Sequence, residues 1–201
     1  MAARLHVAAL VVVLGAACAR PVADETVPFV LETGAPPRPP SATIIGSADR
    51  EVVLTGALYT TDWMAGRGVA KRPPRLPVPW PRPAAIAGAQ SATLAFDSPI
   101  APDFIVVQAF AKVAIASREP TGAPIATFEC GRFTAPRCAF SVTKRGLRVR
   151  GLGRELLAGD YITVFGIWHV PIARQTDSDS EASASWLFHG ENQQRMEASR
   201  P

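Results

Sequence analysis

The sequence predicts an all-β protein that folds as an antiparallel β-sandwich. Short runs rich in β-branched and aromatic residues recur along the chain, and Gly, Pro and Ser residues that favour turns separate them. After the N-terminal apolar run, no segment shows the 3.6-residue period of an amphipathic helix. Many short strands without intervening helices favour two antiparallel sheets packed face to face.

The strand at 160–170 is the clearest element. It is the longest run dense in β-branched and aromatic residues, the pair Gly159-Asp160 opens it with a turn signal, and Pro171 follows it. A loop at 171–183 would join it to the last strand in a closing hairpin. The same pattern predicts the other strands, so that the full set in chain order is 42–45, 51–60, 92–97, 104–113, 125–130, 137–142, 146–150, 160–170 and 184–189.

Composition divides the chain into a leader, a tether, one folded domain and a tail. Arg4 and the apolar run that follows it have the form of a secretory signal over 1–17. That run is shorter than the roughly 20 residues that span a bilayer. The Pro-rich residues 18–41 predict an extended tether, in which 27–31 could add an edge strand. The sandwich is expected over 42–190, with a basic Pro-rich insertion at 64–91, an acidic Ser-rich hairpin loop at 171–183 and a polar tail at 191–201.

The segment that ends the signal, Leu14-Gly-Ala-Ala-Cys18, resembles the lipobox of bacterial lipoproteins. In that family the cysteine is acylated and becomes the new N-terminus, so the resemblance implies a protein anchored to a membrane of the cell envelope. Gly15 stands where the family usually has an aliphatic residue. The alternative is ordinary signal cleavage after Ala19, which would give a soluble secreted or periplasmic protein.

Cys130 and Cys138 form an even pair in a chain with an export signal, which predicts a disulfide. The bond would close a short hairpin and stabilise the fold by about 2–3 kcal/mol in the chain-entropy model. A metal site is the alternative, but two thiols alone do not complete a tetrahedral shell. No cofactor is expected.

The residues Leu157, Gly159 and Tyr161 open the strand at 160–170 in a way that resembles the tyrosine corner of immunoglobulin-like domains. The resemblance implies that the hydroxyl of Tyr161 caps a crossing between the sheets. The closing hairpin also resembles the end of copper-resistance sandwiches of the CopC type. It implies their fold but not their metal, because their N-terminal His and their Asp-x-His loop are missing here. The candidates for a metal-binding alternative are His169 and His189, together with carboxylates.

Two stretches, 64–96 and 131–154, contain no acidic residue and several basic ones. In an exported protein their natural partners are anionic lipid headgroups or envelope polymers. A solvated loop and a charged strand edge that discourages aggregation are the alternative. The chain has Lys+Arg 21 and Asp+Glu 17, a mild excess that does not indicate nucleic acid. The candidate anion contacts are Arg67, Lys71, Arg72, Arg75, Arg82, Arg148 and Arg150.

Both faces of the 160–170 strand are apolar, since its side chains alternate. A face open to water should be polar, so one of the two faces needs a cover beyond the second sheet. The cover would be Trp80 of the insertion, or else a partner protein or lipid surface that uses this face as an interface. The residues expected on this interaction face are Trp80, Ile162, Val164, Trp168, Trp186 and Phe188.

No constellation in the sequence predicts catalysis. Ser141 and Lys144 match the S-x-x-K pattern of penicillin-binding proteins, but a strand would point them to opposite faces. The segment Asp177 to Glu181 begins like a calcium loop, yet Ala182 stands where that loop needs Gly, so a solvated acidic loop is favoured over a loose calcium site. We therefore expect a non-catalytic binding or accessory module, whose partner is an envelope protein or an anionic envelope polymer. A copper-type metal-binding protein and an envelope hydrolase are the alternatives.

Overall fold

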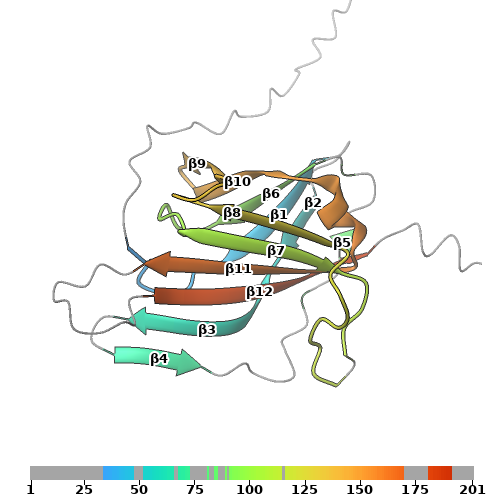
Figure 1. The fold of residues 1–201 in the computed structure, drawn as a ribbon, viewed down its shortest axis with the longest axis horizontal. Coiled ribbons are helices and arrows are strands. Elements are labelled where there is room, and N and C mark those ends of the chain that lie inside the picture. The colour runs from blue at the N-terminus through green and yellow to red at the C-terminus, as the bar shows by residue number, and fades with distance from the viewer. Residues whose placement is uncertain are drawn as a thin grey trace, which may run out of the picture.

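The computed structural model describes residues 34–47, 52–65, 68–72, 81, 84–85, 89, 91–114, 116–169 and 181–191. These residues form two antiparallel sheets packed face to face, which confirms the predicted all-β sandwich (Figure 1). Within the described ranges, no helix is long and apolar enough to cross a membrane. The predicted signal at 1–17, Cys18, most of the loop at 171–183 and the tail from 192 lie outside the described residues.

The smaller sheet has five strands in the order β2-β1-β6-β10-β9. Alternation turns every second residue inward, so that Ile44, Leu94 and Val149 form one buried row across three neighbouring strands. The strands of this sheet are β1 (Ala42–Ser47), β2 (Val52–Thr55), β6 (Ser91–Phe96), β9 (Ala139–Thr143) and β10 (Gly146–Leu152).

The larger sheet has the strand order β4-β3-β12-β11-β7-β8, and the short β5 pairs in parallel with β12. The predicted closing hairpin is confirmed as β11 and β12, which lie at the centre of this sheet. A 3-10 helix, η1 (Arg154–Ala158), leads into β11. The strands are β3 (Ala57–Ala65), β4 (Gly68–Arg72), β5 (Ala84–Ala85), β7 (Phe104–Phe110), β8 (Ala126–Gly131), β11 (Tyr161–His169) and β12 (Glu181–Glu191).

An aromatic cluster fills the space between the sheets. The ring centroids of Trp168 and Trp186 lie 6.3 Å apart on neighbouring strands of the larger sheet. Phe96 of the smaller sheet packs against both rings, at 6.0 and 5.4 Å, and Trp63 meets Trp168 edge-on at 5.1 Å. Such tilted and T-shaped pairs add to the large apolar area that these side chains bury. Gly166 leaves room for the cluster, since a Cβ there would lie 2.9 Å from the Trp168 ring.

The residues expected on an interaction face form the core face of the larger sheet instead. The second sheet covers them, and each is at most 1% exposed, so the prediction is wrong for Ile162, Val164, Trp168, Trp186 and Phe188. Trp80, the remaining member, lies outside the described residues. Alternation shows that a strand has two apolar faces but not which of them turns inward. The outward face of β11 carries the half-buried residues Tyr161, Thr163, Phe165 and Ile167.

Part of the predicted tether belongs to the folded domain. Pro36 and Pro40 are buried, and Ala35 packs against the core. The indole Nε1 of Trp63 donates a hydrogen bond to the carbonyl oxygen of Pro36 at 3.0 Å. A buried indole N–H needs an acceptor, and this segment supplies it. The tether predicted at 18–41 is therefore too long at its C-terminal end.

The single strand expected at 51–60 divides at Gly56 into β2 and β3, one in each sheet. The amide of Gly56 donates to the carbonyl oxygen of Ala42 at 2.9 Å, so the chain turns while it is still bound to β1. A Cβ at this position would lie 2.6 Å from the ring of Phe188. Glycine therefore permits the crossing between the sheets at this point.

Candidate functional site

The outer surface of the smaller sheet is defined by its register. One row of outward residues crosses all five strands, and a second row lies beside it. We call the surface formed by these two rows the basic face. The first row is Thr55, Thr43, Ala95, Arg148 and Ser141, and the second contains Val53, Ile45, Thr93, Arg150 and Ala139.

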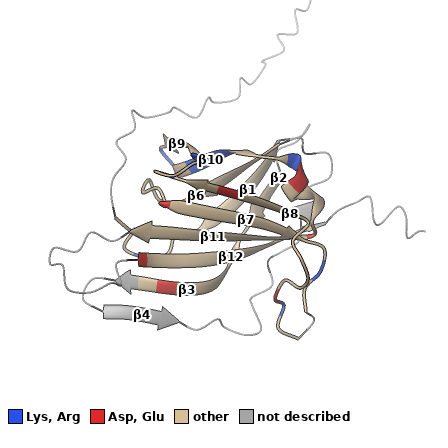
Figure 2. Ribbon diagram, viewed as in Figure 1, with Lys and Arg blue, Asp and Glu red and all other residues tan. Residues whose placement is uncertain are grey.

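Arginine supplies the charge on the basic face. Within the described residues, β1, β2 and β6 contain no charged residue, whereas β10 contributes Arg148 and Arg150. The turn Lys144-Arg145 extends the positive charge at one end of β9, and no acid occurs between 131 and 154. Figure 2 shows basic charge on β10 and at its turn with β9, while acids lie on strands of the larger sheet, in η1 and in loops. Asp97, which follows β6, accepts a hydrogen bond from the amide of Ser41.

The other side chains of the basic face are short. The hydroxyl groups of Thr43, Thr55 and Thr93 can donate and accept hydrogen bonds. Val53 is 48% exposed. The pairing of β10 with β6 is irregular between Val149 and Leu152. The two residues at this irregularity, Arg150 and Gly151, are both exposed. A guanidinium group can bind a phosphate, sulfate or carboxylate through two parallel hydrogen bonds. The face therefore combines donors for an anion with neighbouring side chains that are mostly short.

The two acid-free stretches of the sequence do not form one surface. Lys71 and Arg72 belong to β4, the edge strand of the larger sheet, while Arg148 and Arg150 lie on the smaller sheet. The side chains of Lys71 and Arg72 lie outside the described part of the chain. Arg67, Arg75 and Arg82 lie outside it entirely. The structure thus places Arg148 and Arg150 together and leaves the other candidate anion contacts as predictions.

The two candidate metal-binding histidines lie at opposite ends of the closing hairpin. His189 pairs with Tyr161 at one end of β11, and His169 pairs with Glu181 at the other. The two histidines therefore cannot contribute to one metal site. The ring of His189 instead stacks on the ring of Tyr161, with centroids 4.8 Å apart.

His169 lies between two carboxylates. Its Nδ1 is 3.2 Å from Oδ2 of Asp103, and its Nε2 is 3.5 Å from Oε1 of Glu181. Because the carboxylates meet opposite ring nitrogens, the three groups do not converge on one point where an ion could bind. In the described part of the chain, no group of three His, Cys, Asp or Glu side chains is arranged to hold a metal ion.

Asp103 also anchors the segment that follows β8, a role that the sequence did not predict. Its Oδ1 lies 3.8 Å from the Arg132 guanidinium, and the side chains are only 10% and 3% exposed. The Arg132 amide donates to the Asp103 carbonyl oxygen at 2.7 Å, and Oδ2 of Asp103 accepts from the amide of His169 at 2.6 Å. This ion pair fixes the start of β7 to the segment after β8 and to the end of β11. No local sequence signal joins residues so far apart in the chain.

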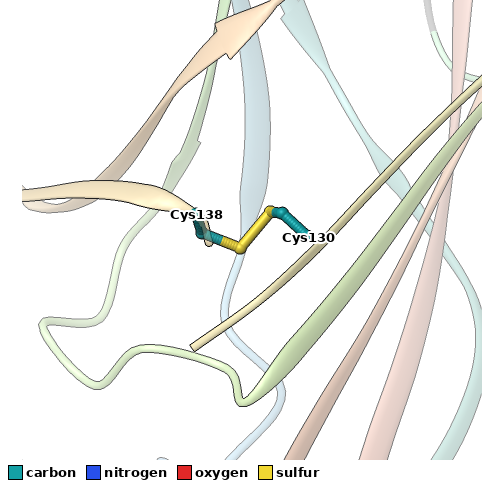
Figure 3. Close-up of a disulfide and its surroundings, with 2 residues drawn as sticks. All are labelled: Cys130 and Cys138. Carbon is teal, nitrogen blue, oxygen red and sulfur yellow. A yellow bond between two sulfur atoms is a disulfide. The ribbon is translucent and has the colours of Figure 1, made fainter. Parts of the chain in front are cut away.

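The predicted disulfide between Cys130 and Cys138 is confirmed, with an S–S distance of 2.05 Å (Figure 3). It does not close a hairpin within one sheet, as the spacing had indicated. Cys130 belongs to β8 at the edge of the larger sheet, and Cys138 precedes β9 at the edge of the smaller one. The bond therefore joins the two sheets along one side of the sandwich.

The Tyr161 ring lies on the outward face of the larger sheet, and η1 delivers the chain to it through the buried Leu156 and Leu157. Burial, and then the charge of Asp160, raises the pKa of Tyr161. Its role as a tyrosine corner stays a prediction.

No protein-family model, curated protein or solved structure matches the chain. What the protein does must therefore be argued from the chemistry of its own surfaces.

Proposed function

We propose that the protein is an exported, lipid-anchored module of the cell envelope that binds an anionic partner through its basic face. The observation that carries this proposal is the distribution of charge between the two sheets. The outer side of the smaller sheet presents Arg148 and Arg150 among uncharged, mostly short side chains, with no acid on its described strands. The larger sheet, by contrast, mixes both signs, with Asp62, Glu129 and Glu181 on strands that share the sheet with Lys71 and Arg72 of β4. A protein surface that needs only solubility mixes both signs, whereas one-signed faces attract partners of opposite charge.

Export and anchoring rest on different observations. A disulfide is expected in an oxidising compartment outside the cytosol, and Cys130–Cys138 fits that setting. Acylation of Cys18 rests on its resemblance to a lipobox. Mass spectrometry of protein from the membrane fraction should find acylated Cys18 as the first residue. An unmodified N-terminus at Arg20 in soluble material would refute the anchor.

The alternatives draw less support from the geometry. A hydrolase needs a nucleophile, a base and an orienting group held together. His169 meets carboxylates at both ring nitrogens and therefore has no free nitrogen directed at a nucleophile. The same arrangement disfavours a copper-type site built on His169. A non-catalytic module needs neither constellation.

The proposal is tested by reversing one charge on the basic face and one elsewhere. Arg150→Glu and the matched control Lys112→Glu change the net charge equally, but Lys112 lies in the loop between β7 and β8. Binding to dextran sulfate, with neutral dextran as the blank, should weaken about tenfold for Arg150→Glu, since a charge-assisted hydrogen bond is lost and repulsion replaces it. Lys112→Glu should change binding by less than about twofold. Equal losses in the two variants would show attraction to net charge alone and would refute a site on the basic face.

A further inference from the structure

The loop 131–137, which we call the stapled loop, is held rigidly at its base. The disulfide joins Cys130 to Cys138 on either side of it. Inside the disulfide, the Gly131 amide donates to the Pro136 carbonyl oxygen at 2.9 Å, and the Cys138 amide donates to the Gly131 carbonyl oxygen at 3.0 Å. A loop closed by three such links loses little conformational entropy when it binds a partner.

The stapled loop presents a large apolar side chain to solvent. Phe133 is 66% exposed, more than the other exposed large hydrophobic residues of the described chain, Val53, Leu58 and Ile125. Directly before it, Arg132 is almost fully buried, and its guanidinium carbon lies 5.0 Å from the centroid of the Phe133 ring. The buried arginine thus fixes the base of the loop while the phenyl ring points away from the core. A rigid, exposed aromatic ring is typical of a binding anchor.

Positive charge accompanies Phe133. Arg137, at the end of the stapled loop, is exposed, and Arg150 of the basic face pairs with Ala139, one residue beyond Cys138. Two acids close to the stapled loop are directed elsewhere. Glu129 belongs to the outward row of the larger sheet, and Asp103 is engaged by Arg132 and His169. The loop and the adjoining end of the basic face therefore combine an apolar tip with the exposed side chains of Arg137 and Arg150.

We infer that the stapled loop and the adjoining basic face dock on an anionic lipid bilayer, with Phe133 in the interfacial layer and Arg137 and Arg150 at headgroup phosphates. An anionic polymer would satisfy the arginines but would leave the phenyl ring in water. A bilayer surface accepts both, because aromatic side chains favour the interface and basic side chains are attracted to anionic lipids. The bilayer would then be the anionic partner of the proposed function, on which this step rests.

Flotation with lipid vesicles tests the inference. The exported protein would carry Cys18→Ala, so that no acyl chain can contribute, and the probes would be vesicles of phosphatidylglycerol with phosphatidylcholine and vesicles of phosphatidylcholine alone. We expect binding to the anionic vesicles only. Phe133→Ala should lower the partition coefficient about tenfold and Arg137→Gln about fivefold. The matched control is Ile125→Ala, which removes another exposed apolar side chain, 52% exposed, at the opposite end of β8 and should have no effect.

Three outcomes would overturn the inference. One is equal loss in Phe133→Ala and Ile125→Ala, and another is equal binding to both vesicle types. The third is a protein that does not bind vesicles but still binds dextran sulfate in an Arg150-dependent manner. That result would refute the bilayer as partner and leave the proposed function standing, with a polymer or protein as partner. Absence of both activities would refute the two proposals together.

Phe133 is exposed, so its substitution should leave the far-UV circular dichroism and the denaturation midpoint unchanged, which separates lost binding from lost fold.

Discussion

Tyr59 illustrates how a single side chain ties a distant loop to a strand. Its hydroxyl donates a hydrogen bond of 2.8 Å to Oε1 of Glu119, which lies in the loop between β7 and β8. Tyr59 itself belongs to β3, and the strands β11 and β12 lie between β3 and β7 in the sheet. The loop must therefore reach across the outward face of the larger sheet to make this contact. Burial, then the hydrogen bond to Glu119 and its charge, raise the pKa of Tyr59 to about 12.

We expect Tyr59→Phe to lower the free energy of unfolding by about 1 kcal/mol at neutral pH, the usual contribution of such a hydrogen bond. The pKa of Tyr59 in the folded state exceeds its ordinary value of 10.0, so the unfolded chain loses the proton first as pH rises. Between pH 10 and 12 the folded state binds more protons, and the free energy of unfolding falls. Urea midpoints at pH 9 and 11 should show a smaller decline in Tyr59→Phe than in the natural protein. The same decline in both proteins would refute the role of Tyr59.

Residue-level predictions succeeded where the chemistry is local and failed where it depends on contacts between distant segments. The disulfide followed from two cysteines eight residues apart in a chain for which an export signal is predicted. The ion pair of Asp103 with Arg132 and the contact of Tyr59 with Glu119 join residues far apart in the sequence. Phe133 could have been noticed as an aromatic residue inside a disulfide-closed loop, but its exposure becomes visible only when the core is known.

At the scale of elements, the strands are predictable because alternation and turn residues are local. The structure confirms strands close to most of the expected ranges, including the closing hairpin. The division at Gly56 was missed, because a glycine that crosses between sheets has the same local pattern as one inside a strand. The strands β4 and β5 were missed as well, because the residues around them read as a Pro-rich insertion.

The sequence also could not show which face of β11 turns inward. Both faces of that strand are apolar, and the partner sheet decides which one is buried. The core cluster of Trp63, Phe96, Trp168 and Trp186 depends on strands from both sheets. Small residues such as Gly166 and Ala184 on the same inward face give those rings their space. In the sequence, these small residues only interrupt the pattern of large apolar residues, and that pattern does not show that they make room for the rings.

At the scale of the whole molecule, the smaller sheet differs from the larger one because its strands carry basic residues but no acid. The outward rows of the smaller sheet carry arginine without acid, while those of the larger sheet carry the acids Asp62 and Glu129 (Figure 2). Arg148 and Arg150 were predicted as anion contacts from composition, but their common face required the register of β6, β9 and β10. The central claim is that this face, and not its opposite, meets the anionic partner.

The most direct test is a reporter on each outer surface. In a Cys18→Ala background, with Cys130 and Cys138 bonded, a cysteine at Thr93 or at Thr127 is the only free thiol. Thr93 lies on the basic face, and Thr127 lies on the outward face of β8 in the larger sheet. An environment-sensitive fluorophore on Thr93→Cys should change its emission when dextran sulfate is added, and the same fluorophore on Thr127→Cys should not. A response at Thr127 with none at Thr93 would contradict the central claim.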